Sequence, residues 1–293
     1  MANLKALKTR IKSVKNTRQI TKAMKMVSAA KLRKATERAV AARPYSLRMG
    51  RMMDSLAPAA AQRQNAPELL IGRGSVKVVN LVVFTADRGL CGGFNSSIIR
   101  TTRDRIVQLE SEGFDVVLTF IGRKGAEVIA RTYPDKIRKV FSNMSRHMSF
   151  EYVEKSVAQE LIQGFQDGEF DACYMVFNHF KSAMSQEVTW IQSIPVPVDE
   201  EAKASTQGEY IYEPSEEELL DDLLPRNLAI QIYQALSESE ASEHGARMTA
   251  MDNAVRNAGD LIKSLSTTYN RSRQAKITTE LIEIISGAES LKS

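Results

Sequence analysis

Apolar residues near the start of the chain recur at the spacing of a coiled-coil helix. The four that set the pattern are separated by three, four and three positions, and they are Leu4, Leu7, Ile11 and Val14. This spacing places all four on one face of an α-helix. After one shift of phase the stripe continues through Ile20, Met24 and Val27, which predicts a stutter in the coiled coil. No Gly or Pro precedes Pro44, so we predict one helix from about Leu4 to Leu56, which Pro44 could kink, within an N-terminal coiled-coil segment over residues 1–57. The helix would be about 80 Å long at roughly 1.5 Å per residue.

The last quarter of the chain carries a second and more regular apolar pattern. Its members alternate at three and four positions and then change phase once, and they are Met248, Met251, Val255, Ala258, Ile262, Leu265 and Tyr269, followed by Ile277, Leu281 and Ile284. Pro225 suits the first turn of a helix, and Gly287 suits its end. The pattern therefore predicts a helix over residues 225–288, roughly 90 Å long.

The two predicted helices need partners, because an isolated helix with one apolar stripe is marginally stable in water. One helix precedes the central region of the chain and the other follows it, and both extend away from that region. The simplest arrangement is therefore an antiparallel coiled coil within one chain, in which each stripe buries the other. A homodimeric scaffold, in which two chains zip together in parallel, is the alternative.

Between the two helices the apolar residues form short, nearly continuous runs, as in strands that are buried on both faces. The four runs cover residues 76–84, 114–121, 137–141 and 172–177. Helical patterns alternate with them over residues 95–110, 124–131 and 150–165. This alternation predicts a Rossmann-like α/β domain over residues 75–198, with a doubly wound, mostly parallel sheet. Residues 188–198 resemble one further strand, which Pro195 and Pro197 would confine to the sheet edge.

Charge is unevenly distributed along the chain. Residues 1–56 contain fifteen Lys and Arg against Glu37 and Asp54, a net charge of +13, although the whole chain carries only +5. Residues 199–222 contain ten acidic residues against Lys203, so we predict an acidic connector over residues 199–224. A basic helix attracts an acidic partner. Nucleic acid is a poor candidate for that partner, because the helix has no DNA-reading motif and its cations do not gather on one face.

The residue types that usually carry catalysis or bind metals are sparse. Cys91 and Cys173 are the only cysteines, too few for a disulfide framework or a thiolate zinc site. The three histidines do not stand at metal-ligand spacing. No run of apolar residues is long enough to span a membrane. The sequence thus indicates a non-catalytic protein with no cofactor and no direct membrane insertion.

A Gly-rich turn follows the first predicted strand, where a Rossmann fold holds a dinucleotide phosphate. Gly89, Gly92 and Gly93 make G-x-x-G-G, which differs from both G-x-G-x-x-G and the Walker A motif. We therefore expect these glycines to form a structural turn with close helix–strand packing, with Asn95 or Ser96 capping the next helix. A nucleotide-binding α/β protein with a coiled-coil scaffold role is the alternative.

Three stretches in order along the chain are more specific than any of these patterns. They are Asn-Thr-Arg-Gln-Ile-Thr-Lys-Ala-Met-Lys-Met-Val at residues 16–27, Asp-Arg-Gly-Leu-Cys-Gly-Gly-Phe-Asn at 87–95, and Tyr-Asn-Arg-Ser-Arg-Gln-Ala-Lys-Ile-Thr-Thr-Glu-Leu-Ile-Glu-Ile at 269–284. Residues 210–214 and 246–251 add to the match. With them the chain resembles the γ subunits of F-type ATP synthases over nearly its whole length.

The resemblance implies that the terminal helices form a coiled coil inside a ring of α and β subunits. The α/β domain would then lie next to the ε subunit and the membrane c-ring. The chain would be the central rotor shaft, which couples proton-driven c-ring rotation to ATP synthesis or hydrolysis on the β subunits. A start without a targeting extension favours a bacterial chain, peripheral on the cytoplasmic face of the inner membrane.

The resemblance also implies roles for individual residues. Contact with the β subunits falls on Met24, Arg247, Gln274, Thr278 and Glu280. Met24 could instead pack in the coiled-coil seam, and the other four could form a solvated helix face. Contact with the c-ring falls on Tyr212 and Glu213, which could instead belong to a solvated acidic loop.

Overall fold

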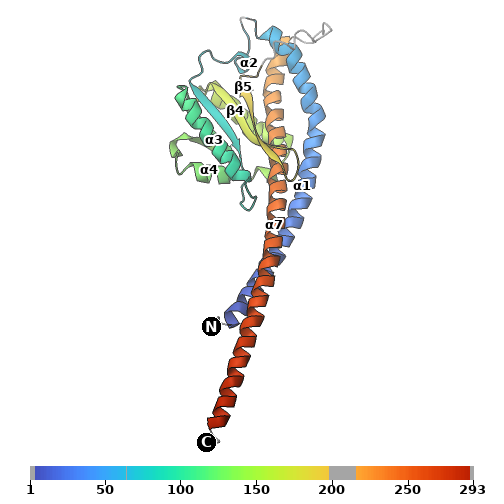
Figure 1. Cartoon of the computed structure of the whole chain (residues 1–293). Coiled ribbons are helices and arrows are strands. Elements are labelled where there is room, and N and C mark those ends of the chain that lie inside the picture. Colours follow the sequence, from blue (N-terminus) through green and yellow to red (C-terminus); the bar gives the residue numbers. More distant parts are fainter. Residues whose placement is uncertain (1–3, 64, 198–215, 291–293) are drawn as a thin grey trace. The chain divides into compact units, whose positions relative to one another are not determined.

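The computed structural model describes residues 4–63, 65–197 and 216–290. The chain divides into two compact units. Unit 1 consists of Met1–Ser28 and Met248–Ser293, and unit 2 consists of Ala29–Arg247. Two long helices contribute to both units, α1 (Leu4–Ala60) and α7 (Glu216–Ser290) (Figure 1).

In unit 1 the two helices run antiparallel. The Nζ atom of Lys25 in α1 lies 2.6 Å from Oδ1 of Asp252 in α7. Seven residues earlier in α1, the guanidinium of Arg18 lies beside Gly259, which is seven residues later in α7. Opposite directions of numbering along one contact line are the mark of an antiparallel pair.

The seam of this pair follows the predicted pattern on α7 and departs from it on α1. Met251, Ala258 and Leu265 of α7 are buried. On α1, however, Ile20 and Val27 are 61% and 58% exposed, so the predicted stutter is wrong. The three-four spacing continues from Val14 without a shift of phase, through the residues at seam positions Arg18, Thr21, Lys25 and Ser28. These seam positions hold polar residues. The nearby apolar residues Ile20 and Val27 lie off the seam, and reading them as its continuation suggests a stutter that the helix does not have.

Unit 2 contains a sheet of five strands in the order β3-β2-β1-β4-β5. The strands are β1 (Val78–Phe84), β2 (Asp115–Ile121), β3 (Ile137–Phe141), β4 (Ala172–Phe180) and β5 (Gln186–Ile194). The first four are parallel, and β5 pairs antiparallel with β4 at the edge. The predicted doubly wound, mostly parallel sheet with a fifth strand at the edge is therefore confirmed, but this strand ends at Ile194, so Pro195 and Pro197 follow it and do not lie within it as predicted.

Helices cover both faces of the sheet, as a doubly wound fold requires. On one face lie α3 (Phe94–Ser111) and α4 (Arg123–Ile129), which pack on Val79, Leu81 and Val83 of β1. On the other face, α5 (Phe150–Val153), a π-helical turn (Glu154–Ala158) and α6 (Gln159–Gln166) pack with α7 on Val82 and Phe84. Alternate residues of one apolar strand thus build two separate cores. The short helical turns of unit 2 are α2 (Glu68–Ile71), η1 (Pro134–Lys136) and η2 (Met144–Arg146).

The two long helices also pack against each other inside unit 2. Arg38 of α1 pairs with Glu240 of α7 at 2.7 Å, and the Ser46 hydroxyl donates to the Gln234 side chain at 2.6 Å. Further along, Met53, Leu56 and Ala60 share an apolar cluster with Leu220 and Leu224. These pairs again run in opposite directions, so the antiparallel arrangement holds in this unit by its own contacts.

The ends of α7 differ from the sequence expectation. The helix begins at Glu216 and ends at Ser290, so Pro225 is not in its first turn and Gly287 does not end it. Leu220 and Leu224 explain the early start, because their burial against α1 stabilises helix before the proline. Part of the predicted acidic connector is therefore helical, and its residues 199–215 lie outside the described residues.

Two glycines inside α7 should respond differently to alanine, although alanine is favoured over glycine in a helix by about 1 kcal/mol. A Cβ on Gly259 would lie 3.8 Å from the Arg18 guanidinium carbon, an ordinary contact. A Cβ on Gly245 would lie 3.1 Å from Cα of Ala183, where backbone must move. We expect Gly259→Ala to stabilise the chain by about 0.5–1 kcal/mol, measured by urea unfolding. Gly245→Ala is the matched comparison, and an equal gain there would contradict the contact argument.

Candidate functional site

The Gly-rich turn between β1 and α3 has positive φ at two residues, Leu90 and Gly92. Gly92 has a φ of +57°, in the left-handed region that favours glycine. A Cβ on Gly89 would meet no atom within 4 Å, and one on Gly93 would lie 3.9 Å from the Ser96 hydroxyl. The expected close packing therefore does not occur at Gly89 and Gly93.

Polar groups of the turn bind other parts of unit 2. The Asp87 carboxylate accepts from the backbone N–H of Arg123 at 3.2 Å and of Asn143 at 2.8 Å. The Asn95 side-chain oxygen accepts from Ala86 N–H at 2.9 Å. The residue preceding α3 is Gly93, and no side chain caps that helix, so the expected cap from Asn95 or Ser96 is wrong.

Helix α7 occupies the place beside the turn where a nucleotide would bind in a Rossmann fold. The strand order reverses between β1 and β4, and such a switch point is the usual ligand crevice. Ala246 of α7 packs there with Ala86, Cys91 and Phe94. Burial raises the pKa of the Cys91 thiol, so this cysteine is held neutral as part of the packing.

Arg247 joins α7 to the turn through hydrogen bonds. Its Nη2 donates to the carbonyl oxygens of Arg88 and Gly89, both at 3.2 Å. Its Nη1 donates to the Glu243 carboxylate at 2.6 Å and to Nδ1 of His244 at 3.2 Å. The residue is only 8% exposed. Arg247 therefore has a structural role within its own chain, and its predicted contact with a β subunit stays a prediction.

Replacing Arg247 with methionine should destabilise unit 2. Methionine keeps most of the apolar stem but removes every donor, which leaves the Glu243 carboxylate and two carbonyls without these hydrogen bonds. We expect a loss of about 2–3 kcal/mol, measured by chemical denaturation. Arg33→Met is the matched control, because Arg33 is exposed and pairs with Glu37 within α1, and it should leave the denaturation midpoint almost unchanged. Equal effects of the two substitutions would contradict the role of Arg247.

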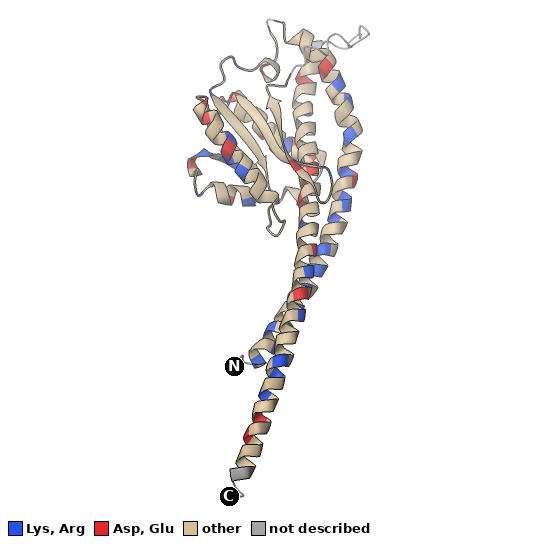
Figure 2. Cartoon of the chain, viewed as in Figure 1, with Lys and Arg blue, Asp and Glu red and all other residues tan. Residues whose placement is uncertain are grey.

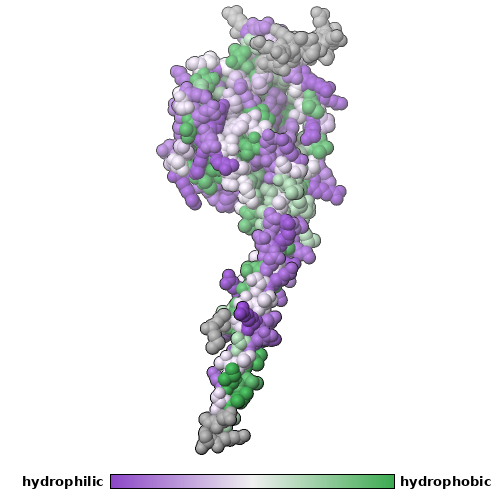
Figure 3. Space-filling model, viewed as in Figure 1, coloured by the Kyte–Doolittle hydropathy of each residue, from purple (hydrophilic) through white to green (hydrophobic). Residues whose placement is uncertain are grey.

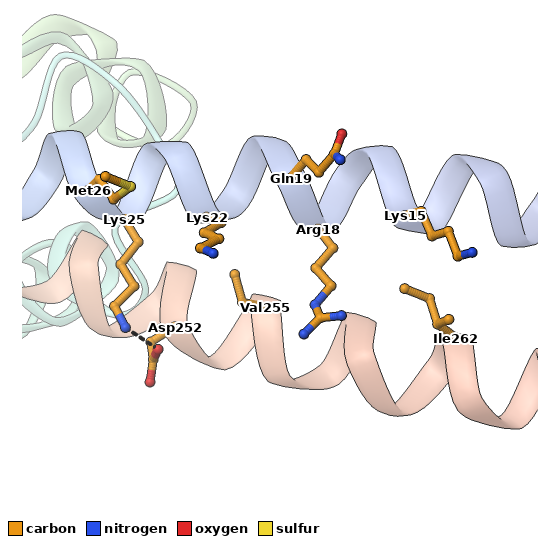
Figure 4. A pocket seen from close by; sticks show the side chains of 9 residues that line it. All are labelled: Lys15, Arg18, Gln19, Lys22, Lys25, Met26, Asp252, Val255 and Ile262. Atoms are coloured by element: carbon orange, nitrogen blue, oxygen red, sulfur yellow. Dashed lines mark hydrogen bonds and ion pairs between the residues drawn. The ribbon is translucent and has the colours of Figure 1, made fainter.

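In unit 1, a basic groove lies between the two helices (Figure 4). It has a volume of about 700 Å³, and its lining residues are Lys15, Arg18, Gln19, Lys22, Lys25, Met26, Asp252, Val255 and Ile262. The four cations come from α1, and the one acid in this lining, Asp252, comes from α7. In Figure 2 the basic residues of α1 form a succession of blue positions along the helix. The groove thus gives unit 1 a surface suited to acidic groups.

The C-terminal part of α7 exposes large apolar side chains. Within unit 1 this part extends past the first turn of α1 (Figure 1). Ile277, Leu281, Ile282, Ile284 and Ile285 are between 52% and 71% exposed, and Figure 3 shows a green patch near the end of this helix. A group of exposed apolar side chains like this one is typical of a surface that contacts another protein.

The structure distributes the predicted contact residues among these surfaces. Met24 is half-buried in unit 1, and Gln274, Thr278 and Glu280 are exposed on α7 near the apolar patch. Tyr212 and Glu213 lie outside the described residues.

The sequence pattern placed Ile20 and Val27 of α1 in the seam, whereas the structure exposes both on the surface of unit 1. The available signal was their phase. They are seven positions apart, but they do not continue the spacing that runs from Leu4 to Val14.

The described residues show neither a metal centre nor a membrane span. No group of three or more His, Cys, Asp or Glu side chains among them is arranged to hold a metal ion. No helix in the described part of the chain has the length and apolarity to cross a membrane.

Comparisons with known proteins agree over the whole chain. A family model described as ATP synthase matches residues 3–291. The ATP synthase gamma chain of Magnetococcus marinus is 74% identical over 292 residues, covering 100% of both chains. The gamma chain of Rhodospirillum rubrum is 51% identical over 300 residues, covering 99% of this chain and 100% of that one.

Solved structures give the same result for the fold. The central stalk and c-ring structure of the Tetrahymena thermophila mitochondrial ATP synthase contains a chain that is 28% identical, with a TM-score of 0.61, covering 80% of this chain and 99% of that one. A chain of the Euglena gracilis mitochondrial ATP synthase is 22% identical with a TM-score of 0.69, covering 98% and 94%, and this likeness concerns the fold alone. The chain therefore belongs to the gamma-chain family of ATP synthases, whose members are non-catalytic subunits of the central stalk.

Proposed function

We propose that this chain is the central rotor shaft of a bacterial F-type ATP synthase, and that unit 1 turns inside a ring of α and β subunits. In this role the chain makes no ATP. It changes the conformation of each β subunit in turn. A binding partner can shift a conformational equilibrium only if it makes different contacts with the different conformations. An asymmetric shaft supplies such differences as it rotates.

The observation that carries this proposal is the exposed apolar end of α7. At about 100° per residue, the side chains at positions 277, 281, 282, 284 and 285 cover an arc of about 160° around the helix. A single partner helix covers a narrower stripe. An apolar arc of this width fits a sleeve that surrounds the helix, as an enclosing ring of subunits would.

Charge supports the same arrangement at the other surface of unit 1. The basic groove presents Lys15, Arg18 and Lys22 on the helix that carries half-buried Met24. An acidic segment of a β subunit would complement these cations, with Met24 providing an adjacent apolar contact. Contacts of Gln274, Thr278 and Glu280 with the β subunits belong to the same proposal, on the exposed face of α7.

The remaining partners and the location complete the proposal. We place the ε subunit and the c-ring at the α/β domain side of the chain, with Tyr212 and Glu213 as c-ring contacts. The chain would then be peripheral on the cytoplasmic face of the bacterial inner membrane. The similar Tetrahymena chain comes from a structure of a central stalk with a c-ring, and this supports the c-ring as a partner.

Reconstitution tests the proposal. Purified α and β subunits of the same source would be mixed with or without this chain, and ATP hydrolysis and assembly measured. We expect assembly and multi-site turnover only with the chain present, and no hydrolysis by the chain alone. A chain truncated after Leu265 measures how much the apolar end contributes. Hydrolysis by the isolated chain, or failure to assemble with the ring subunits, would overturn the proposal.

A further inference from the structure

In unit 1 the apolar seam of α1 stops after Val14. From Arg18 to Ser28, the seam positions of α1 are polar or charged. The facing stretch of α7 contributes the apolar side chains Met251, Val255 and Ala258, beside Asp252 opposite Lys25 and Gly259 opposite Arg18. When apolar side chains face polar ones, shifting one helix along the other changes the packing energy little. Packing in this stretch therefore specifies the register of the two helices only weakly.

An ion pair crosses between the helices in this stretch. Lys25 Nζ lies 2.6 Å from Oδ1 of Asp252 (Figure 4), and Arg256 lies 3.3 Å from the other carboxylate oxygen. The hydrogen bond and charge of Lys25 hold the pKa of Asp252 below its usual value. Both side chains remain more than one-third exposed, so the pair adds little to stability. The ion pair nevertheless forms in only one register of the two helices, because a slip of one helical turn would separate the charges by about 5 Å.

We propose that Lys25 and Asp252 are positioning residues, whose ion pair fixes the local register of α1 against α7 within unit 1 and thereby sets the position of the half-buried Met24. Met24 immediately precedes Lys25 on the same helix. A displacement of Lys25 along or around α7 therefore moves Met24 by the same amount. A polar group at a seam position that selects one register at small cost in stability is a known use of such residues in coiled coils. The consequence for catalysis rests on the proposed function, whereas the register itself does not.

Charge reversal and charge exchange test the pair in the full-length chain. Lys25→Asp opposes two carboxylates, Asp252→Lys opposes two ammonium groups, and the double exchange restores an ion pair with reversed sense. Spin labels on Ser13→Cys and Ser264→Cys, both exposed and outside the pair, report the register through their distance distribution.

Two features of the chain keep this measurement specific. The native cysteines are buried, and burial raises the pKa of Cys173 to about 12, so labelling is confined to the introduced thiols. The same charge exchange at Arg33 and Glu37, an exposed pair within α1, is the matched control.

The second readout is ATP hydrolysis after reconstitution with α and β subunits. We expect each single reversal to broaden or shift the label distances and to lower kcat by about fivefold or more, with KM for ATP unchanged because nucleotide binds to other chains. The double exchange should restore both readouts to within about twofold. The Arg33–Glu37 exchange should change neither.

Several results would overturn the inference. Unchanged distances in both single reversals would show that the pair does not set the register. Altered distances that the double exchange fails to restore would show that the effect does not come from the pair. Altered distances with unchanged turnover would remove the link to Met24. Failure of the unaltered chain to stimulate the ring subunits would instead be a failure of the proposed function, and the distance measurements would still decide the register.

Discussion

Replacing Gly122 with alanine is expected to destabilise unit 2 by about 4 kcal/mol or more. Gly122 lies between β2 and α4 with a φ of +103°, and a Cβ there would lie 1.8 Å from the carbonyl oxygen of Thr85. The atom it would meet belongs to the backbone, so no side chain can move aside. The same junction contains the hydrogen bonds from Thr85 N–H to Ile121 and from Gly122 N–H to Phe141. The clash therefore separates the ends of β1, β2 and β3 together, and urea unfolding would measure the loss.

Gly113→Ala separates the two causes of that loss. Gly113 has a φ of +90°, but a Cβ there would meet no atom within 4 Å. This substitution should cost only the backbone strain, about 1–2 kcal/mol. Only Gly122 has the contact with Thr85, so most of the difference between the two variants is expected to come from that contact. Similar losses at both positions would mean that the junction yields more easily than its geometry indicates.

The second large effect is expected at the apolar end of α7. Ile277, Leu281 and Ile284 would be changed together to glutamine, which keeps good helix propensity. Because the three side chains are exposed in the isolated chain, its own stability should change by less than about 0.5 kcal/mol. Burial inside a surrounding ring is worth about 1–2 kcal/mol for each side chain, so assembly should weaken by about 3–6 kcal/mol. Titration of the labelled chain into α and β subunits measures this directly.

A triple variant that exchanges the same residues for other aliphatic side chains is the matched control. Ile277→Leu, Leu281→Ile and Ile284→Leu keep the apolar area and should assemble to within about tenfold of the unaltered chain. Unweakened assembly of the glutamine variant would mean that the ring does not cover this part of α7. The proposed function would then lose the observation on which it rests.

The α/β domain could be predicted from the sequence because its signals are local. Nearly continuous apolar runs such as β1 indicate strands covered on both faces, and the alternating helices indicate parallel connections. The seam of α7 between Met251 and Leu265 could be predicted for the same reason, since the period of the helix appears directly in the spacing. The ring partners came from family resemblance and comparison, since no local pattern specifies them.

The sequence could not determine which side chains fill the seam of α1. Ile20 and Val27 are apolar, whereas Arg18 and Lys25 are charged. Assigning the apolar residues to the buried side of the helix therefore selects the wrong face of α1. Only the pairing with α7 reveals that the seam remains in phase, because burial is a property of two helices together. The early start of α7 likewise depends on contacts of its first turns with α1.

The sequence by itself determined the helical period, the strand–helix alternation and the excess of positive charge, because each depends on residues close together in the chain. The tertiary structure alone decided what the Gly-rich turn binds. Arg88 and Gly89 precede Arg247 by 159 and 158 residues, and no spacing rule joins them. Hydrogen bonds between such distant segments form only when the fold brings α7 to the end of β1, and that placement turns a crevice typical of nucleotide binding into a contact within the chain.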